Sequence, residues 1–386
     1  MTSPSPSPSP SPSDTAPAAP KSPDAIGTGV LNDDAWLARR PPEDILEPGL
    51  AIIDPHHHLW DRKQHRYLLD ELRADVGTMV GTTGGTLVGN TAGSGHRVLA
   101  TVFVDCMAFY RADGPVALRP VGETEFANGV AAMCASGQLG ELRACAGIVG
   151  FADLTLGAAV QDVLLAHIAA GGGPNGRFKG IRHAGGWDAS PMIHNSHTRP
   201  PRGLYGEPSF LAGFAQLAPL GLSFEAWQYH PQLPEVTALA RAFPDTAIIL
   251  NHVGGPLGVG PYASAYAGKS HETFAPWRRD IAELATCPNV SVKLGGLGMR
   301  IGPIQHFKLP DPPSSQQVAD AWRPWIDACI ESFGPARGMF ESNFPVDKTS
   351  ASYAVLWNAF KRLAAGASAD EKADLFAGTA RRVYRL

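Results

Sequence analysis

Short apolar runs alternate with longer stretches rich in Ala and Leu from about residue 50 to the end of the chain. The apolar runs have the composition of β-strands, and the stretches between them have helical character. Several runs are apolar at consecutive positions, which is typical of parallel strands that are covered by helices. The predicted strands span residues 51–57, 98–104, 145–151, 178–183, 222–228, 246–252, 289–295 and 337–343.

Eight such units predict a (β/α)8 TIM barrel, formed by a single domain at residues 26–386. A doubly wound open sheet is the competing architecture, and it would show a glycine-rich phosphate-binding turn after an early strand. This chain instead has the sequence DPHHH at residues 54–58, at the end of the first predicted strand. The barrel is therefore the favoured fold.

Long segments follow the C-terminal ends of several predicted strands. In a barrel, the loops at this end build the walls of the active site, so the fold itself predicts where the site lies. The segments span residues 77–95, which are rich in Gly and Thr, and residues 184–209, 254–275 and 296–316.

Residues 1–25 form a Ser- and Pro-rich tail. We expect this tail to be disordered, because Pro alternating with small polar residues cannot build a core, and it lacks the apolar segment of an export signal. The five cysteines are scattered and show no CxxC spacing, which indicates neither a disulfide framework nor a thiolate zinc site. We therefore expect a cytoplasmic protein.

Composition narrows the range of partners. The chain has 386 residues, of which 44% are hydrophobic, so it can bury a large core. A formal net charge of -4 provides no basic field for nucleic acid, and no apolar stretch is long enough to suggest a membrane span. A small-molecule substrate is the expected partner. Barrels of this kind often form homo-oligomers, but the surface pattern does not decide this point.

Histidines stand at the ends of three predicted strands. In an extended strand, His56 and His58 share one face while His57 takes the other. Two imidazoles on one face are a natural start for a divalent-metal site, although a polar strand end with incidental histidines is the alternative. His230 and His252 end two later strands, and strand ends converge on the barrel axis. The four histidines could therefore form one site.

Five motifs in order resemble the amidohydrolase-related family. They are IIDPHHHLWD, FKGIRHAGGWD, the HP step at residues 230–231, IILNHVGGP and MFESNFPVDK. The chain looks most like the branch that contains sugar lactonases and 2-pyrone-4,6-dicarboxylate lactonase, which also lies near metal-dependent decarboxylases. The resemblance runs from about residue 50 to the end of the chain and implies a hydrolase with a barrel fold.

The resemblance also implies roles for particular residues. In such families, the HxH pair, a His ending strand five and an Asp ending strand eight surround a metal, and the His ending strand six assists the chemistry. This implies that His56, His58 and His230 are metal ligands, with zinc or a similar divalent ion. It implies that His252 is an acid/base or a carbonyl-polarising group.

One position departs from the family pattern. Where the family reads SDxP, this chain reads SNFP, so Asn343 replaces the aspartate. A neutral amide cannot act as a general base and is a poor metal ligand. Either histidines and water hold the metal, or the site works without one. Asp347 and Glu341 are candidate substitutes, although a surface salt bridge for Asp347 and a buried structural pair for Glu341 are the alternative readings.

Arg182 resembles the family arginine that holds a substrate carboxylate or carbonyl oxygen, for which its forked guanidinium is suited. The alternative is an arginine that pairs with Glu225 or Glu341 inside the barrel. Lys293 could be the same sort of residue. The aromatic side chains of Trp60 and Tyr229 are predicted to wall the pocket.

These predictions favour hydrolysis of a small, anionic lactone or related cyclic ester by an attacking water. Arg182 would orient the substrate and His252 would relay the proton, while Asn343 and Asp347 complete the predicted catalytic set. A metal-dependent decarboxylase is a second hypothesis, and a catalytically disabled barrel that binds a small ligand is a third.

Overall fold

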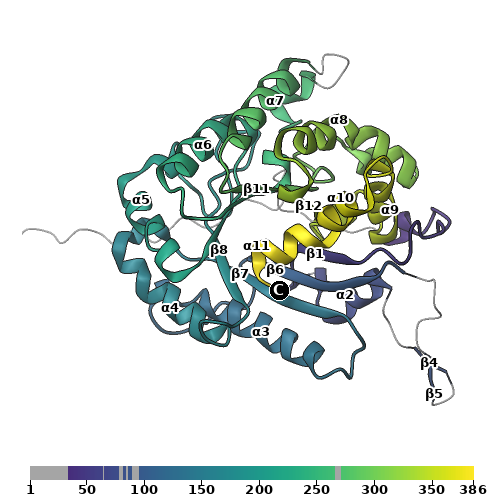
Figure 1. Ribbon diagram of the computed structural model, residues 1–386, viewed down its shortest axis with the longest axis horizontal. Coiled ribbons are helices and arrows are strands. Elements are labelled where there is room, and N and C mark those ends of the chain that lie inside the picture. Colours follow the sequence, from purple (N-terminus) through teal and green to yellow (C-terminus); the bar gives the residue numbers. More distant parts are fainter. Residues whose placement is uncertain (1–33, 64, 78–80, 84–85, 89–94, 266–270) are drawn as a thin grey trace, which may run out of the picture.

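The computed structural model describes residues 34–386 apart from residues 64, 78–80, 84–85, 89–94 and 266–270. Eight parallel strands follow one another around a barrel, each paired with the next in chain order (Figure 1). The strands are β1 (Ile52–His57), β6 (Val98–Val104), β7 (Arg143–Gly150), β8 (Phe178–Arg182), β9 (Ser223–Ala226), β10 (Ile248–Leu250), β11 (Val290–Leu294) and β12 (Gly338–Phe340). Each predicted strand overlaps one of them, so the predicted barrel is confirmed. The predicted tail and part of the segment at 77–95 lie outside the described residues.

Helices surround the barrel, and each barrel strand is followed by a helix of seven or more residues. Across the described part of the chain, no helix is both long and apolar enough to cross a membrane. The eight helices are α2 (Leu69–Val76), α3 (Val121–Ala135), α4 (Val160–Ala170), α5 (Pro208–Phe214), α6 (Leu233–Ala242), α7 (His271–Ala285), α8 (Ser315–Phe333) and α9 (Tyr353–Leu363). Three short helices complete the set, namely α1 (Asp34–Leu37), α10 (Ala369–Ala373) and α11 (Thr379–Tyr384).

Local sequence signals set the ends of the longest helix, α8. The side chain of Ser314 accepts a hydrogen bond from the backbone N–H of Gln317, and the Gln317 side chain accepts one from the Ser314 backbone N–H. This reciprocal pair satisfies two N–H groups that a helix start leaves without partners. Gly334, with a φ of 73°, ends the helix in a conformation that favours glycine.

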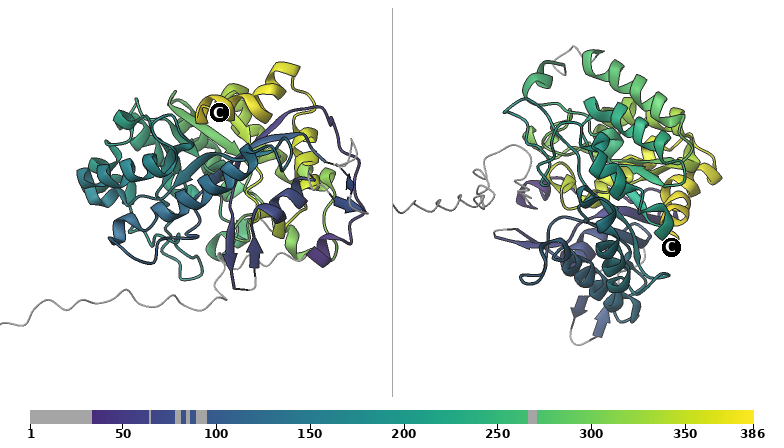
Figure 2. Two further views of the ribbon diagram at one scale, coloured as in Figure 1. Left: turned by 90° about the horizontal axis from the view of Figure 1, so that it is seen from below. Right: turned by 90° about the vertical axis from the view of Figure 1, so that its left-hand side faces the viewer.

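Two small antiparallel hairpins are added to the barrel. The pair β2 (Trp60–Arg62) and β3 (His65–Tyr67) lies on the side of the molecule opposite the C-terminal helix α11 (Figure 2). The pair β4 (Gly81–Thr83) and β5 (Thr86–Val88) falls in the Gly- and Thr-rich segment. The first hairpin directly follows the histidine-bearing strand β1, so it is placed to form a wall of the site.

An apolar layer fills the barrel at the end that α11 covers. Side chains from several strands pack there against the C-terminal helix, and burial of this kind is the main favourable contribution to folding. Apolar contacts therefore dominate the packing between the strands and α11 at this end. The layer includes Ile53, Ala100, Val102, Val104, Val149, Ile249, Met339, Ala377, Ala380 and Tyr384.

The barrel closes between β1 and the segment after β12. The backbone N–H of His58 donates to the carbonyl of Phe344 at 2.7 Å, and the N–H of Asn343 donates to the carbonyl of His56 at 3.0 Å. These bonds join the first and last units of the barrel, which removes the open edges that a flat sheet would expose.

Asp54 strengthens this closure from inside the protein. One carboxylate oxygen accepts a hydrogen bond from the backbone N–H of Ser342 at 3.0 Å, and the other accepts one from the hydroxyl of Tyr353 at 3.0 Å. Burial raises the pKa of Asp54 to about 6. The aspartate of the DPHHH sequence is therefore a structural residue that ties the two ends of the barrel together.

We predict that Asp54→Ala lowers the free energy of unfolding by about 3 kcal/mol, because it leaves buried donors on two elements without an acceptor. Tyr353→Phe removes only one of these bonds and should cost about 1 kcal/mol. Urea unfolding followed by circular dichroism measures both values. Equal losses in the two variants would contradict the role of Asp54 as the shared acceptor.

Candidate functional site

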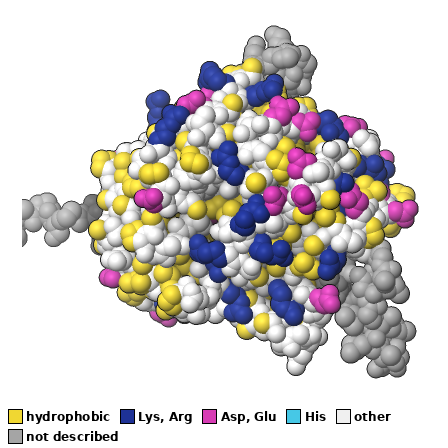
Figure 3. All heavy atoms as spheres, in the orientation of Figure 1, with side chains coloured by type: hydrophobic (Ala, Val, Ile, Leu, Met, Phe, Trp, Pro, Cys, Tyr) yellow, Lys and Arg dark blue, Asp and Glu magenta, His cyan; other side chains and the backbone are white. Residues whose placement is uncertain are grey.

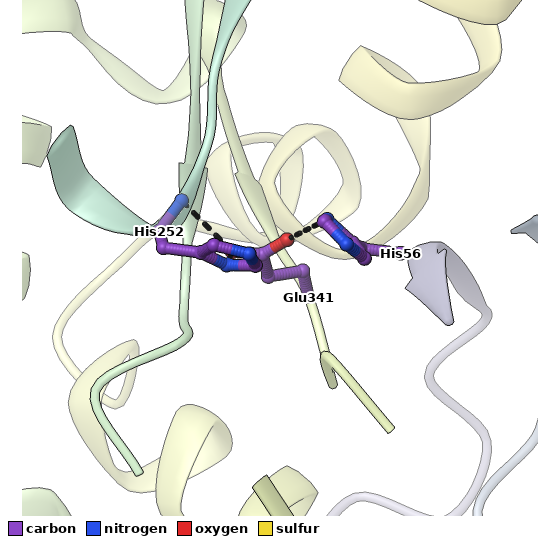
Figure 4. Close-up of side chains that lie close together, drawn as sticks. All are labelled: His56, His252 and Glu341. Atoms are coloured by element: carbon purple, nitrogen blue, oxygen red, sulfur yellow. Dashed lines mark hydrogen bonds and ion pairs between the residues drawn. The ribbon is translucent and has the colours of Figure 1, made fainter. Parts of the chain in front are cut away.

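Three ionisable side chains meet at the C-terminal end of the barrel (Figure 4). His56 lies on β1, His252 follows β10, and Glu341 directly follows β12. All three are at most 2% exposed. Glu341 lies between the two rings: its Oε1 accepts a hydrogen bond from Nδ1 of His252 at 2.7 Å, and its Oε2 lies 2.8 Å from Nδ1 of His56. Convergence of the strand ends thus brings both ends of the domain into one site.

The hydrogen bonds of His56 and His58 fix where their protons lie. The carbonyl of Val104 can only accept, so Nδ1 of His58, 2.8 Å away, carries a proton. Nε2 of His58 then accepts from Nε2–H of His56 at 3.3 Å. This leaves a lone pair on Nδ1 of His56, which accepts a hydrogen bond from the Lys293 ammonium at 3.2 Å.

Burial keeps the histidines of this cluster neutral. It lowers the pKa of His56, His58 and His252 well below the usual value. The charge of Arg182 lowers all three pKa values further, and that of Lys293 lowers those of His56 and His252. A neutral imidazole can accept a proton at physiological pH. The histidines are therefore available as bases or hydrogen-bond partners.

Burial shifts the pKa of Glu341 in the opposite direction from the pKa values of the histidines. Burial raises the pKa of its carboxyl group to about 8. The Oε2 atom forms no hydrogen bond with another residue of the described part, and it faces the lone pair on Nδ1 of His56. The nearby carboxylate of Glu225 raises the pKa of Glu341 as well, whereas Lys293 and the backbone N–H of His252 lower it.

The backbone around His252 is held in an uncommon conformation. His252 has a φ of 52° and the next residue, Val253, has a φ of 45°, which are rare values for residues other than glycine. Asn343 across the cluster has a φ of 53°. Such outliers often occur at functional sites, where the surrounding structure holds them in place.

Gly296 makes room for the His252 ring. A Cβ atom on this residue would lie 2.4 Å from Cβ, Cγ and Nδ1 of His252, and its φ of 71° favours glycine in any case. A side chain at this position would displace the ring from Glu341. Only glycine therefore allows the loop after β11 to approach the histidine so closely.

Arg182 is already neutralised by a neighbouring carboxylate. Its Nε donates to Asp105 at 2.6 Å, while Nε2 of His197 lies 3.3 Å from the other oxygen of Asp105. Burial alone would raise the pKa of Asp105, but the charge of Arg182 and the contact with His197 hold it below its usual value. The predicted alternative partners of Arg182, Glu225 and Glu341, are therefore not its ion-pair partners. Asp105 could have been found from the sequence, because it directly follows the strand at 98–104.

Glu225 is paired with Lys293 instead. The two charged groups are 2.8 Å apart and both side chains are fully buried. The carboxylate of Glu225 also accepts hydrogen bonds from the amide of Asn251 and the hydroxyl of Tyr384. The Tyr384 contribution could not be read from the sequence, because it comes from the last helix.

The predicted metal set of His56, His58 and His230 is not the set that the structure brings together. His230 begins a 3-10 turn beyond the end of β9, where side chains no longer point alternately towards the barrel axis. Its Nδ1 accepts a hydrogen bond from the N–H of Leu257 at 3.2 Å, and its ring packs edge-on against Tyr262. The cluster instead contains His252 and Glu341 next to His56.

By donor type, the cluster suits a metal. The two imidazoles and the carboxylate offer ligand atoms within 4.8 Å of one another, and zinc accepts such a donor set. The Oε2 atom of Glu341 has no hydrogen-bond partner among the described residues, which also favours a metal ligand at this position. However, Lys293 already donates to the lone pair of His56 that faces the cluster, and Nη1 of Arg182 lies 3.4 Å from its other nitrogen. The arrangement around His56 therefore does not fit a divalent cation.

Asn343 and Asp347 form a pair beside the cluster. The amide of Asn343 donates to Asp347 at 2.8 Å, and the backbone N–H of Gly298 donates to the other carboxylate oxygen at 3.0 Å. Burial raises the pKa of Asp347 to about 8. Asn343 borders a cavity at the mouth of the barrel, described below, whereas Asp347 is not among the residues that line it. Asp347 therefore orients Asn343 from behind, and the surface salt bridge considered for it is wrong because the residue is buried.

A cavity of about 200 Å³ opens next to His252. All three predicted substrate-binding residues, Arg182, Trp60 and Tyr229, border it. Its size suits a small molecule, and its wall combines aromatic rings with cationic groups. The lining residues also include His58, Arg62, Cys106, His194, His197, Trp227, His252, Arg300 and Asn343.

A second hollow lies at the opposite end of the barrel, beside α11, on the face where Figure 3 shows Lys and Arg side chains gathered. It includes Lys179, Arg381 and Arg385 but no histidine, cysteine or carboxylate side chain among its lining residues. The histidines that could take part in acid–base chemistry therefore border the first cavity and not this hollow.

The fold and site together define a barrel with a histidine and carboxylate cluster at the C-terminal ends of its strands. The amidohydrolase family model matches residues 53–386 of this chain. The protein therefore belongs to the amidohydrolase family, as its sequence motifs predicted.

Two relatives illustrate how similar this chain is to other proteins in sequence. The protein y4mH of Sinorhizobium fredii is 32% identical over 348 residues, which are 87% of this chain and 99% of the relative. An L-fucono-1,5-lactonase of Burkholderia multivorans is 29% identical over 194 residues, which are 48% of this chain and 58% of the relative.

Solved structures show the same fold. A Burkholderia multivorans amidohydrolase with bound zinc has a TM-score of 0.61 at 22% identity, over 87% of this chain and 99% of that one. A Pseudomonas putida protein described as a putative 2-pyrone-4,6-dicarboxylic acid hydrolase has a TM-score of 0.53 at 16% identity, over 87% of this chain and 98% of that one.

We predict that Gly296→Ala lowers kcat for the reaction of this site by about 100-fold, because the added methyl group displaces the His252 ring and small misplacements of catalytic groups have effects of this size. Steady-state kinetics measures the change. Gly366→Ala is the matched control, since no atom lies within 4 Å of a Cβ at that position. Equal kinetics in the two variants would show that the ring position is unimportant.

Proposed function

We propose that this protein hydrolyses a lactone or a related small cyclic ester. The observation that carries the proposal is the His252–Glu341 pair, whose histidine borders the cavity, in a member of the amidohydrolase family. Two of the relatives in sequence are L-fucono-1,5-lactonases, although this chain spans only 58% and 50% of their lengths. Their names support the reaction type and leave the substrate open.

His252 is the general base in this mechanism. Its Nδ1–H donates to Glu341, so the neutral ring presents Nε2 as the acceptor for a proton of the attacking water. Burial keeps its pKa well below the usual value, so the ring is unprotonated before the reaction. Glu341 holds the tautomer and stabilises the imidazolium that forms.

Arg182 and His58 both border the cavity. The guanidinium of Arg182 keeps donor capacity beyond its bond to Asp105, because it carries five N–H groups. It can therefore stabilise the oxyanion that develops when water adds to the carbonyl carbon. When the ring opens, the imidazolium of His252 returns the proton to the leaving alkoxide. The mechanism requires no step at a metal.

The cavity favours a substrate that carries a carboxylate. Arg62 and Arg300 both border it. Nη2 of Arg62 donates to the carbonyl of Cys106 at 2.6 Å, and neither arginine has a carboxylate partner within the described ranges of the chain. Arg62 lies over the ring of Trp60 at 4.2 Å, and Nε of Arg300 is a buried donor without a partner among the described residues. Because Arg182 is neutralised by Asp105, these two arginines rather than Arg182 supply the uncompensated positive charge.

The proposal is tested with a panel of lactones in pairs with and without a carboxylate, followed by a pH-indicator assay. We expect turnover, with the carboxylate-bearing member of each pair preferred. His252→Gln should lower kcat by about 100-fold to 10,000-fold, the usual contribution of a general base. His306→Gln, a buried histidine that does not border the cavity, should keep wild-type rates.

Other outcomes of this assay would redirect the assignment. Ligand binding without turnover would favour a binding protein, and release of carbon dioxide from aromatic acids would favour a decarboxylase. Loss of activity in His306→Gln but not in His252→Gln would remove His252 from the mechanism.

We predict that kcat/KM for lactone hydrolysis rises as the pH increases through about 8, the pKa of Glu341. Above this pH the carboxyl group is ionised, and a carboxylate raises the basicity of the His252 ring to which it is bonded. Rates are corrected for spontaneous hydrolysis at each pH. Glu341→Gln should show a lower rate and lose this step, whereas an unchanged step in that variant would assign it to another group.

A further inference from the structure

Lys293 lies on β11, and its ammonium is 5.6 Å from the centre of the Tyr384 ring on the last helix. Its side chain has no solvent exposure. The ammonium group lies 2.8 Å from Glu225 and 3.2 Å from Nδ1 of His56, so it connects the interior ion pair with the histidine cluster. A charged amine at this place acts directly on any ion that would bind there.

The hydrogen bonds of Glu225 show that this pair is ionised. Three donors point at its carboxylate, namely the Lys293 ammonium, the Asn251 amide and the Tyr384 hydroxyl. A carboxyl group surrounded only by donors is an acceptor and carries the negative charge. Lys293 is its counter-ion and therefore carries the positive charge.

The other buried charges near the cluster are also paired. Arg182 is bonded to Asp105, so that pair is neutral as a unit. Among the described residues that approach His56 or His252, Glu341 is then the one carboxyl group without a Lys or Arg partner. A divalent ion in the cluster would bring two positive charges, and Glu341 can offset only one of them. A buried charge without compensation is strongly unfavourable.

We propose that Lys293 keeps divalent metal out of the His56–His252–Glu341 cluster, because its ammonium occupies the lone pair of His56 and withholds the charge of Glu225 from the site. The protein then works without a resident metal ion, in contrast to the zinc-bound state of its Burkholderia multivorans neighbour in fold. This inference does not depend on the substrate. It concerns metal binding alone and can hold or fail whether or not lactones are hydrolysed.

The test measures zinc in the full-length protein. Protein is produced with added zinc, dialysed against a weak chelator and analysed by elemental mass spectrometry. Zinc affinity is then measured by competition with a chromophoric indicator. Wild-type protein should retain well below one equivalent. Lys293→Gln should bind zinc about 10- to 100-fold more tightly, the size of effect that groups around metal ligands usually have.

Two further variants separate charge from other effects. In Glu225→Gln with Lys293→Gln, the ammonium and its carboxylate are both neutral, so the charge balance equals that of the wild type and the gain in affinity should largely disappear. Adding Glu341→Gln to Lys293→Gln should also abolish the gain, because it removes a ligand. Lys179→Gln alters another buried lysine, which borders the hollow at the other end of the barrel, and should leave zinc affinity unchanged.

Several results would overturn the proposal. One equivalent of zinc in the wild type, lost on His252→Ala, would show that the cluster binds metal in the presence of Lys293. Equal zinc affinity in Lys293→Gln and the wild type would show that the Lys293 ammonium does not weaken zinc binding. A gain of equal size in the Glu225→Gln, Lys293→Gln double variant would refute the charge balance. If Lys293→Gln does not fold, cobalt titration of the wild type decides, since ligand-field absorption bands would reveal a formed site.

Discussion

Charged groups buried inside this barrel must pair with one another, because a buried charge without a partner is strongly unfavourable. Arg182 with Asp105 and Lys293 with Glu225 form two buried ion pairs, with separations of 2.6 Å and 2.8 Å. Removing one member of such a pair leaves an isolated charge, which costs several kcal/mol. The pairs therefore constrain where the strands that carry them can lie. Glu341 lies between His56 and His252, next to these two pairs. Its pKa is raised because it is fully buried there.

The chemistry of the site depends on the apolar layer beneath it. Side chains such as Ile249 and Met339 seal the end of the barrel that α11 covers, so water is excluded from below. Tyr384 belongs to this layer, and its hydroxyl donates to Glu225. The last helix thus contributes to the electrostatics of the cluster. This explains how a residue so near the C-terminus can affect groups at the opposite end of the barrel.

Some residues of the site could be predicted from the sequence and others could not, depending on whether they lie at the end of a barrel strand or in a turn beyond it. His252, Trp60 and Tyr229 border the cavity as predicted, because residues at the C-terminal ends of barrel strands converge. His230 was assigned to the metal set on the same rule, but a turn after β9 places it against Leu257 instead. Asp105 was missed, although its position directly after a predicted strand was a usable signal.

The sequence by itself determined the fold and the end of the barrel that carries the site. Its alternation of apolar runs and helical stretches admits few other packings, and its histidines follow strand ends. Only the tertiary structure decided which charges pair, which lone pair of His56 is occupied and how close Gly296 comes to His252. These properties depend on distances of a few ångströms between residues that are far apart in the chain. Sequence patterns record the order of residues and the faces they occupy, but not such distances.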